Sequence, residues 1–225
     1  MWEKRKRELH TIVGRSGSGK TALLRALQIK TDRALVFDCF GNFDTGLLIR
    51  SQSELWHYLN QYLNHFRIIY RPAIDVTDRD LLTAEINYLC RIARAVNPCG
   101  LFLDELDTFC DATSLPAELD ILIRYGRNIE VSLHAAVRRP KAVIPRHYVT
   151  ETTRFSIFRC VDPSDGAFLE DFTGIPREKI QALPELRFID WLEGDWQYKQ
   201  IKIRPDRKIT ITTLAGISLP LENSA

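Results

Sequence analysis

The chain has 225 residues, of which 45% are hydrophobic and 27% are charged, and its formal net charge is +2. This length and composition are ordinary for one compact globular domain that buries its own core. The sequence contains no run of 18 apolar residues, so it predicts no membrane span. The small net charge does not by itself indicate that the protein binds nucleic acid.

Short apolar segments rich in β-branched residues alternate with longer segments of helical period. We predict strands at 8–14, 33–40, 67–72, 101–106, 131–137 and 154–161, and helices at 20–29, 53–66, 78–96 and 116–128. This alternation predicts an α/β fold with a mostly parallel central sheet that helices cover on its faces.

The pattern changes after Pro176. Segments 187–192, 196–203 and 208–214 resemble strands joined by short turns, so we expect a C-terminal antiparallel or extended β segment. We therefore expect a single domain over 1–225, with a basic segment at 1–8, a core at 9–175 and a closing segment at 176–225. A basic run such as 4–7 is commonly a solvated end, and the polar tail 222–225 is expected to fray.

The five cysteines have no C-x-x-C spacing, so they predict neither a zinc site nor a redox motif. An odd, scattered set favours reduced thiols in a cytosolic compartment, mostly as small core residues. The sequence also lacks the apolar N-terminal region that a secretory signal requires.

The stretch GRSGSGKT fits the pattern G-x-x-x-x-G-K-[ST] between a predicted strand and a predicted helix, which is the context of a P-loop. Glycines let the backbone wrap an anion, while successive N–H groups and the helix N-terminus point at phosphates. Lys20 supplies a charge at the β and γ oxygens of ATP, and the Thr21 hydroxyl is a predicted Mg²⁺ ligand. The predicted nucleotide-binding residues are Gly14, Arg15, Ser16, Gly17, Ser18, Gly19, Lys20, Thr21 and Ala22.

A second pattern, LFLDE at 101–105, places two acids at the end of an apolar strand. Ligands bind at the carboxyl ends of strands in open α/β sheets. We predict that Asp104 holds Mg²⁺, through water, and that Glu105 polarises the attacking water. Taken alone, the pattern also fits an ordinary surface strand end.

Other P-loop classes are disfavoured because the chain has no NKxD-like guanine motif and no LSGGQ-like stretch. Small-molecule kinases remain open, although they do not need the Asp-Glu pair.

The stretch IRYGRNIEVSLHAAVRRP at 123–140, together with both motifs, resembles the FtsK–HerA superfamily of DNA-pumping P-loop ATPases. Further similarity lies in LVFDCFGNFD, which is like the family's second strand, and in RFSIFRCVDPSDGAFLEDFTG, which is like its fifth strand and following helix. The resemblance covers roughly residues 9–192. It implies a RecA-like fold and a Mg²⁺-dependent ATPase.

The resemblance also implies roles for three arginines. In this family an arginine of one subunit completes the neighbour's site, and the matching residues are Arg127 first and Arg124 second. Both also lie at a predicted helix end, where cations complement the helix dipole. Arg138 stands where the family usually has a glutamine sensor, and it can contact phosphate, face DNA or be an ordinary surface residue. His134 is expected to be a packed core histidine.

The implied assembly is a ring, a hexamer, that moves double-stranded DNA. A compact chain of this kind resembles the genome-packaging ATPases of membrane-containing, tailless viruses and phages. That likeness implies the host cytoplasm, association with the virion, and a capsid vertex or membrane-associated portal protein as docking partner. The alternatives are a plasmid or conjugation ATPase, a nucleotide-gated switch with little turnover, and a small-molecule kinase.

Overall fold

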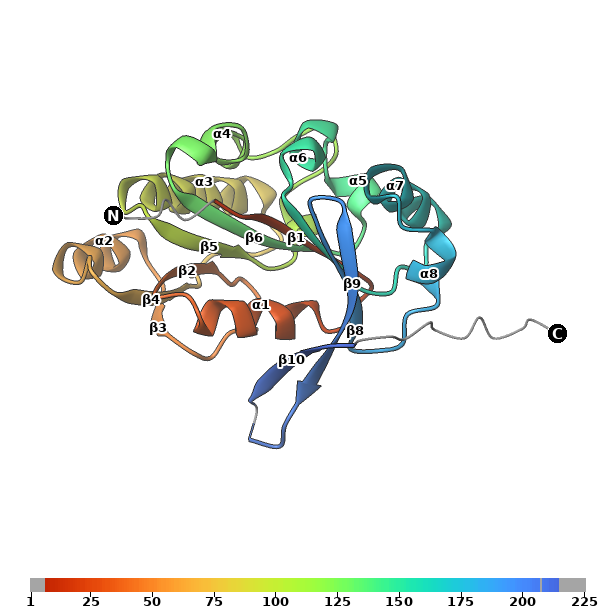
Figure 1. The fold of residues 1–225 in the computed structure, drawn as a ribbon. Helices are drawn as coiled ribbons and strands as arrows, with labels where there is room; N and C mark the ends of the chain where they lie inside the picture. The colour runs from red at the N-terminus through yellow and green to blue at the C-terminus, as the bar shows by residue number, and fades with distance from the viewer. Residues whose placement is uncertain (1–6, 207, 215–225) are drawn as a thin grey trace.

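A single ten-stranded sheet organises the computed structural model, which describes residues 7–206 and 208–214 (Figure 1). The strand order is β10-β9-β8-β7-β1-β6-β5-β2-β4-β3. The strands are β1 (Leu9–Val13), β2 (Arg33–Phe37), β3 (Leu47–Ile49), β4 (Phe66–Tyr70), β5 (Cys99–Leu103), β6 (Val131–Val137), β7 (Arg154–Ile157), β8 (Arg187–Leu192), β9 (Asp195–Ile203) and β10 (Ile209–Thr213).

Seven of these strands, β7 through β3 in the sheet order, pair in parallel. Parallel neighbours need crossover connections, and helices supply most of them. The helices are α1 (Lys20–Ile29), α2 (Gln52–Gln61), α3 (Arg79–Ala95), α4 (Ala117–Tyr125), α5 (Pro140–Val143), α6 (Arg146–Glu151), α7 (Pro163–Thr173) and α8 (Arg177–Gln181), with short 3-10 turns η1 (Leu106–Thr108) and η2 (Gly126–Asn128).

Helices cover the two faces of the sheet unequally. Figure 1 shows α3, α4 and α6 on one face and α1 on the other. The larger apolar core lies on the first face and includes Leu9, Leu101 and Leu133, whereas a smaller core of Ile12, Leu24 and others lies under α1. Alternate β1 residues thus enter different cores, as the period-2 geometry of a strand requires.

The C-terminal strands extend the sheet in the antiparallel sense. β8 pairs with both β7 and β9, and β10 pairs with β9. Gly194, with φ 101°, makes the tight β8–β9 turn. Ile201, Ile209 and Ile211 pack against the smaller core, so this segment helps to cover the face on which α1 lies. The β9–β10 hairpin projects from the body in Figure 1.

The predicted α/β fold, with a mostly parallel sheet and an antiparallel C-terminal segment, is confirmed. The second helix ends at Gln61 instead of residue 66 because Phe66 pairs with Arg33 in the sheet. It begins after Ser51, whose side chain forms a reciprocal cap with Glu54. β3 and the short helices α5, α6 and α8 were not predicted.

All five cysteines are free thiols, and all except Cys39 are buried. Across the described residues, no helix has both the length and the apolar character of a membrane span. Residues 1–6 of the basic segment and the tail 222–225 lie outside the described residues.

Candidate functional site

The GRSGSGKT loop connects β1 to α1 at the carboxyl end of β1. Gly14, Gly17 and Gly19 have φ values of 156°, 76° and 111°. A Cβ on Gly14 would lie 2.6 Å from the Phe158 Cβ and 2.8 Å from the Ser18 Oγ, so that position has no room for a side chain. The loop therefore keeps the tightly wound, glycine-dependent backbone that the motif predicts.

Lys20 lies at the start of α1 and is almost fully buried. Its ammonium group donates to the carbonyl oxygens of Gly14 at 2.7 Å and Arg15 at 2.9 Å. Within the described residues, the charge is therefore held inside the loop by backbone carbonyl dipoles, and no carboxylate forms an ion pair with it. Such a group is suited to receive a phosphate oxygen.

Electrostatics around Lys20 show which side chains share this site. Burial lowers the pKa of the Lys20 ammonium, and Arg138 lowers it further, whereas the carboxylates of Asp104, Asp107 and Glu105 raise it. The four side chains thus lie within electrostatic reach of Lys20. An anion bound in the loop would counter the desolvation of the ammonium.

The loop residues fit a phosphate group. The Ser18 Oγ is buried and has no hydrogen-bond partner within the described part of the chain. The space that a Cβ on Gly17 would occupy is open, and the N-cap of α1, Gly19, provides no side-chain cap for the first N–H groups of the helix. These unsatisfied donors around a helix N-terminus are the features of an anion site.

Asp104 follows β5 and lies opposite the loop. Its Oδ2 accepts hydrogen bonds from the Thr21 hydroxyl at 3.0 Å and from the Asn42 side-chain amide at 3.1 Å. Burial raises the pKa of the Asp104 carboxyl, although these hydrogen bonds and Lys20 oppose the shift. A carboxylate and a hydroxyl meeting at 3.0 Å form an oxygen donor set of the kind that Mg²⁺ prefers.

Glu105 occupies the left-handed region of backbone space, with φ 53° and ψ 57°, at the start of η1. Its N–H donates to the Asp104 Oδ1 at 3.1 Å, and its carbonyl accepts from the Thr108 N–H at 3.0 Å. This conformation is uncommon for a residue with a Cβ, and such positions gather at functional sites. The backbone thereby turns sharply after the strand, with Glu105 only partly buried.

Asp107, in this turn, binds the backbone of the residues that follow β6. Its carboxylate accepts the N–H groups of Arg138 at 2.8 Å and Arg139 at 3.1 Å. The Arg138 guanidinium approaches the same carboxylate at 4.0 Å. The backbone of Arg138 is therefore tied to the turn that follows Asp104 and Glu105.

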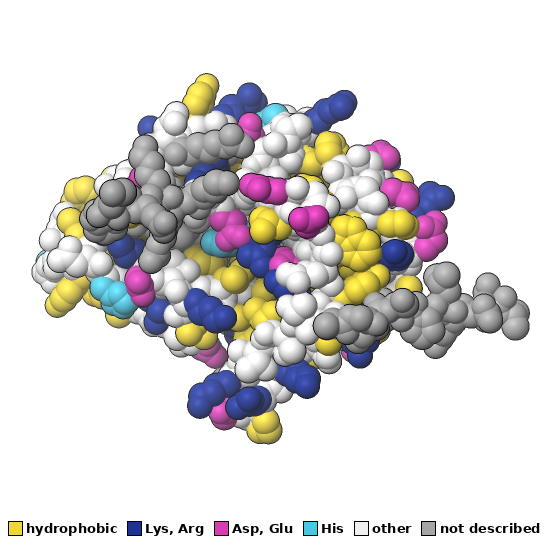
Figure 2. All heavy atoms as spheres, in the orientation of Figure 1, with side chains coloured by type: hydrophobic (Ala, Val, Ile, Leu, Met, Phe, Trp, Pro, Cys, Tyr) yellow, Lys and Arg dark blue, Asp and Glu magenta, His cyan; other side chains and the backbone are white. Residues whose placement is uncertain are grey.

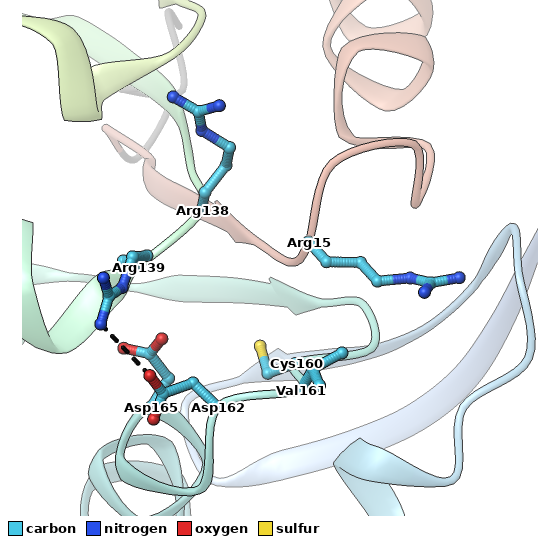
Figure 3. Close-up of a pocket in the computed structure, with 7 residues that line it drawn as sticks. All are labelled: Arg15, Arg138, Arg139, Cys160, Val161, Asp162 and Asp165. Atoms are coloured by element: carbon cyan, nitrogen blue, oxygen red, sulfur yellow. Dashed lines mark hydrogen bonds and ion pairs between the residues drawn. The ribbon is translucent and has the colours of Figure 1, made fainter.

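A pocket of about 160 Å³ lies beside the loop (Figure 3). Its lining residues are Arg15, Arg138, Arg139, Cys160, Val161, Asp162 and Asp165. Figure 3 shows Arg15 and Arg138 pointing apart, while Arg139 turns toward Asp162, with which it forms an ion pair of 3.2 Å. The pocket borders the phosphate cradle, because Arg15 both lines the pocket and belongs to the loop.

The remaining predicted loop residues are peripheral. Arg15 forms an exposed ion pair of 3.0 Å with Glu185, and Ser16 is exposed. Ala22 packs partly against the smaller core. These positions shape or flank the loop, and the carbonyl oxygen of Arg15 is one of the two that accept from Lys20.

The structure does not bring Arg124 or Arg127 to the loop of the same chain. Both precede the amino end of β6, whereas the loop lies at the carboxyl end of the neighbouring parallel strand β1. Arg124 forms a 2.8 Å ion pair with Asp120 one helical turn away. Arg127 lies in η2, and its side chain is outside the described part of the structure.

Asn42 is the site residue that sequence reasoning missed. It lies 62 positions from Asp104, in a loop that Asp38 organises by accepting the N–H groups of Asn42 and Phe43. The Arg71 Nη2 forms an ion pair of 2.6 Å with the Oδ2 of the same Asp38 carboxylate. The only available signal was the polar, glycine-containing end of the second strand.

The fold and the cradle together define the class: the chain has the architecture of a P-loop ATPase. The genome packaging NTPase B204 from Sulfolobus turreted icosahedral virus 2, in complex with AMPPCP, matches with a TM-score of 0.66 at 15% identity, over 91% of this chain and 96% of that one. The DNA-packaging ATPase B204 from Sulfolobus turreted icosahedral virus matches with a TM-score of 0.61 at 14% identity, over 91% and 96%.

A more distant match is EccC (ATPases 2 and 3) from Thermomonospora curvata, in complex with a signal sequence peptide. Its TM-score is 0.53 at 14% identity, over 86% of this chain and 36% of that one. No family model matches the sequence, and no curated protein matches it. At these identities the likeness shows the fold, which is the one that the resemblance to FtsK–HerA ATPases predicted.

Proposed function

We propose that this chain is a Mg²⁺-dependent ATPase of the FtsK–HerA superfamily that translocates double-stranded DNA. One observation carries the ATPase assignment: Lys20 and Thr21 of the loop converge with Asp104, and Glu105 follows directly at the same sheet edge. The DNA assignment is supported by the likeness to the B204 proteins, which are a genome packaging NTPase and a DNA-packaging ATPase.

Each residue has a defined part in hydrolysis. The Lys20 ammonium and the first N–H groups of α1 would hold the β- and γ-phosphates. Thr21 and Asp104 would hold Mg²⁺, which neutralises charge on the phosphate oxygens when bound. Glu105 would accept a proton from the attacking water, so that ATP and water give ADP and phosphate.

Basic residues near the site and on the hairpin support a polyanionic partner. Arg138 and Arg139 are exposed at the end of β6, beside the cradle. Lys202, Arg204 and Lys208 are exposed near the tip of the β9–β10 hairpin, where Figure 2 shows Lys and Arg side chains gathered at the lower end of the molecule. Duplex DNA presents phosphates to such cations.

The family analogy extends the proposal to assembly and biology. Identical chains form a ring, a hexamer, in which Arg127 or Arg124 of one subunit reaches the neighbour's cradle. The ring packages a viral genome in the host cytoplasm and docks on a capsid vertex or a membrane-associated portal protein. The position of both arginines, far from their own cradle along β6, suits action between subunits.

Steady-state ATP hydrolysis, measured with and without duplex DNA, tests the proposal. A motor hydrolyses ATP with Mg²⁺ and is stimulated by duplex DNA. A nucleotide-gated switch stays slow in both conditions, and a small-molecule kinase stays slow until its acceptor is added. Slow hydrolysis that DNA leaves unchanged would refute the motor.

A further inference from the structure

A buried polar cluster lies at the amino end of β1, whereas the cradle lies at the carboxyl end of the same strand. His10 of β1 and His134 of β6 are register partners on adjacent parallel strands, so their side chains lie next to each other on one face. Their exposed fractions are 0% and 6%. Glu8, just before β1, reaches the same place with a partly exposed carboxylate.

Three ligand atoms converge in this cluster. The Nδ1 atoms of His10 and His134 are 3.4 Å apart, the Glu8 Oε2 is 4.0 Å from the His134 Nδ1, and all three atoms lie within 4.8 Å of one another. A separation of 3.4 Å is long for a hydrogen bond between nitrogens. Two imidazole nitrogens at about 2.1 Å from a tetrahedral Zn²⁺ lie about 3.4 Å apart.

Neighbouring groups fix which nitrogen of His10 is available. The Ser156 hydroxyl donates to the Asp190 carboxylate at 3.3 Å, so it accepts the Nε2–H of His10 at 2.8 Å. The Nδ1 of His10 therefore carries the lone pair that faces His134. A hydrogen bond on the distal nitrogen is what orients histidine ligands in metal sites.

The other two groups are also held in place. The His134 ring stacks on Phe102 with centroids 4.6 Å apart. The Glu8 Oε1 accepts from Arg154 at 2.9 Å, which leaves Oε2 directed to the histidines. One side chain from each of two strands and one from the residue before β1 are thus preorganised around one point.

The neutral state of the two histidines and the balanced charges around them favour binding of a cation that prefers nitrogen ligands. Burial is the main cause that lowers the pKa of both histidines, that of His134 to about 4. Both rings are therefore neutral near pH 7, as metal ligands must be. Among the charged groups that face them, Glu8 and Asp190 balance Arg154 and Lys199.

We propose that Glu8, His10 and His134 form a binding site for one transition-metal ion of the Zn²⁺ class, which ties the segment before β1 to β6. Two imidazoles and one carboxylate favour Zn²⁺ or Co²⁺ over Mg²⁺ or Ca²⁺. The ion leaves a fourth position for water. The site is independent of the ATPase assignment.

Titration of metal-stripped full-length protein with Co²⁺ tests this site. We expect one equivalent to bind with the visible absorption of a four-coordinate site of two nitrogen and two oxygen donors, and Zn²⁺ to displace it. Glu8→Gln and His134→Gln should weaken binding about tenfold or more. Matched controls are His57→Gln, which alters a histidine on α2, and Asp104→Asn, which removes the predicted Mg²⁺ ligand; both should bind like wild type.

A second measurement covers variants that fold poorly. Zn²⁺ should raise the Tm of the wild type but not of Glu8→Gln, whose partly exposed carboxylate can be changed without opening the core. Absence of Co²⁺ absorption in the wild type overturns the proposal. Unchanged binding in both folded ligand variants does so as well. Neither result bears on ATP hydrolysis.

Discussion

At the residue scale, Lys20 has the most specific environment in the site. Its ammonium is buried, and its hydrogen-bond partners among the described residues are two carbonyl oxygens of the loop. Lys20→Ala should abolish tight ATP binding and reduce hydrolysis by about 100-fold or more, because it removes the charge facing the phosphates. Equilibrium binding of a fluorescent ATP analogue measures the first effect. Lys30→Ala, at the exposed end of α1, is the control, and wild-type turnover in Lys20→Ala would refute the cradle.

Substitutions of Glu105 and Asp104 should have different effects on ATP hydrolysis. Glu105→Gln should keep ATP bound and lose hydrolysis by about 100-fold or more, because an amide is nearly isosteric but accepts no proton. Asp104→Asn should instead raise the Mg²⁺ concentration needed for half-maximal activity, because it weakens the oxygen donor set beside Thr21. Single-turnover hydrolysis and Mg²⁺ titration distinguish the two variants. Normal hydrolysis by Glu105→Gln would show that another residue is the general base. Substitutions of Asp38 and Asp107 would then be tested next.

The residue scale also shows how far the sequence predicts the site. The loop and Asp104 were predictable because a glycine pattern and an acid at a strand end are local signals, and parallel strands bring their carboxyl ends together. Two other features were not predictable: the contact of Asn42 with Asp104, and the hydrogen bonds from the backbone N–H groups of residues 138 and 139 to Asp107. Their partners lie 62 and about 31 positions away, and only tertiary packing brings them together.

At the element scale, the junction between the parallel and antiparallel parts depends on one buried ion-pair network. Asp190 of β8 accepts two hydrogen bonds from Arg154 of β7, at 2.7 and 2.8 Å, and pairs with Lys199 of β9. Asp190→Asn should lower the free energy of unfolding by about 3 kcal/mol, because the half-buried Lys199 loses the Asp190 carboxylate and Arg154 is left with its ion pair to Glu8. Urea denaturation at pH 7 measures this loss. Asp195→Asn, at an exposed position, should change little.

The same network predicts a pH dependence. Although burial acts in the opposite direction, Arg154 and Lys199 hold the pKa of Asp190 below its usual 3.8. A carboxyl with a depressed pKa stabilises the folded state above its unfolded pKa and loses that contribution as pH falls through its folded value. The difference between wild type and Asp190→Asn should therefore be full at pH 7 and shrink below pH 3.8. A constant difference at every pH would contradict the ion-pair explanation.

The β9–β10 hairpin should act in DNA binding. The double variant Lys202→Glu/Arg204→Glu should keep basal hydrolysis and lose most stimulation by duplex DNA, with a weaker salt dependence, because phosphate contacts release counterions. Arg50→Glu/Lys30→Glu, with the same change of charge on exposed residues elsewhere, is the control. Equal stimulation in both double variants would remove the hairpin from the DNA interface.

Elements differ in how well the sequence predicts them. α1 and α3 have long helical patterns and appear within a residue of their predicted limits. β3 has three residues, two of them exposed, and α5 has four, so neither has a hydrophobic period long enough to detect. The antiparallel segment was predictable because short turns such as 193–195 separate its strands.

At the scale of the whole molecule, the arginines decide whether the site is shared between subunits. Arg127→Ala chains should bind ATP and fail to hydrolyse it as a homogeneous ring. Mixing them with Lys20→Ala chains should restore activity, because an intact Arg127 then serves an intact cradle in its neighbour. Arg138→Ala, beside its own cradle, should give little rescue in the same mixture. If the mixture of Arg127→Ala and Lys20→Ala chains assembles, as verified by sizing, but does not regain ATP hydrolysis, Arg127 does not act between subunits. Arg124 would then be tested for that role.

Movement along DNA is the central claim, and displacement of a triplex-forming oligonucleotide from duplex DNA tests it most directly. The wild type with ATP and Mg²⁺ should strip the third strand at a rate that exceeds spontaneous loss. Glu105→Gln, which keeps ATP bound, should not. Displacement at the spontaneous rate by wild-type protein that hydrolyses ATP on the same DNA would contradict the assignment as a translocating motor.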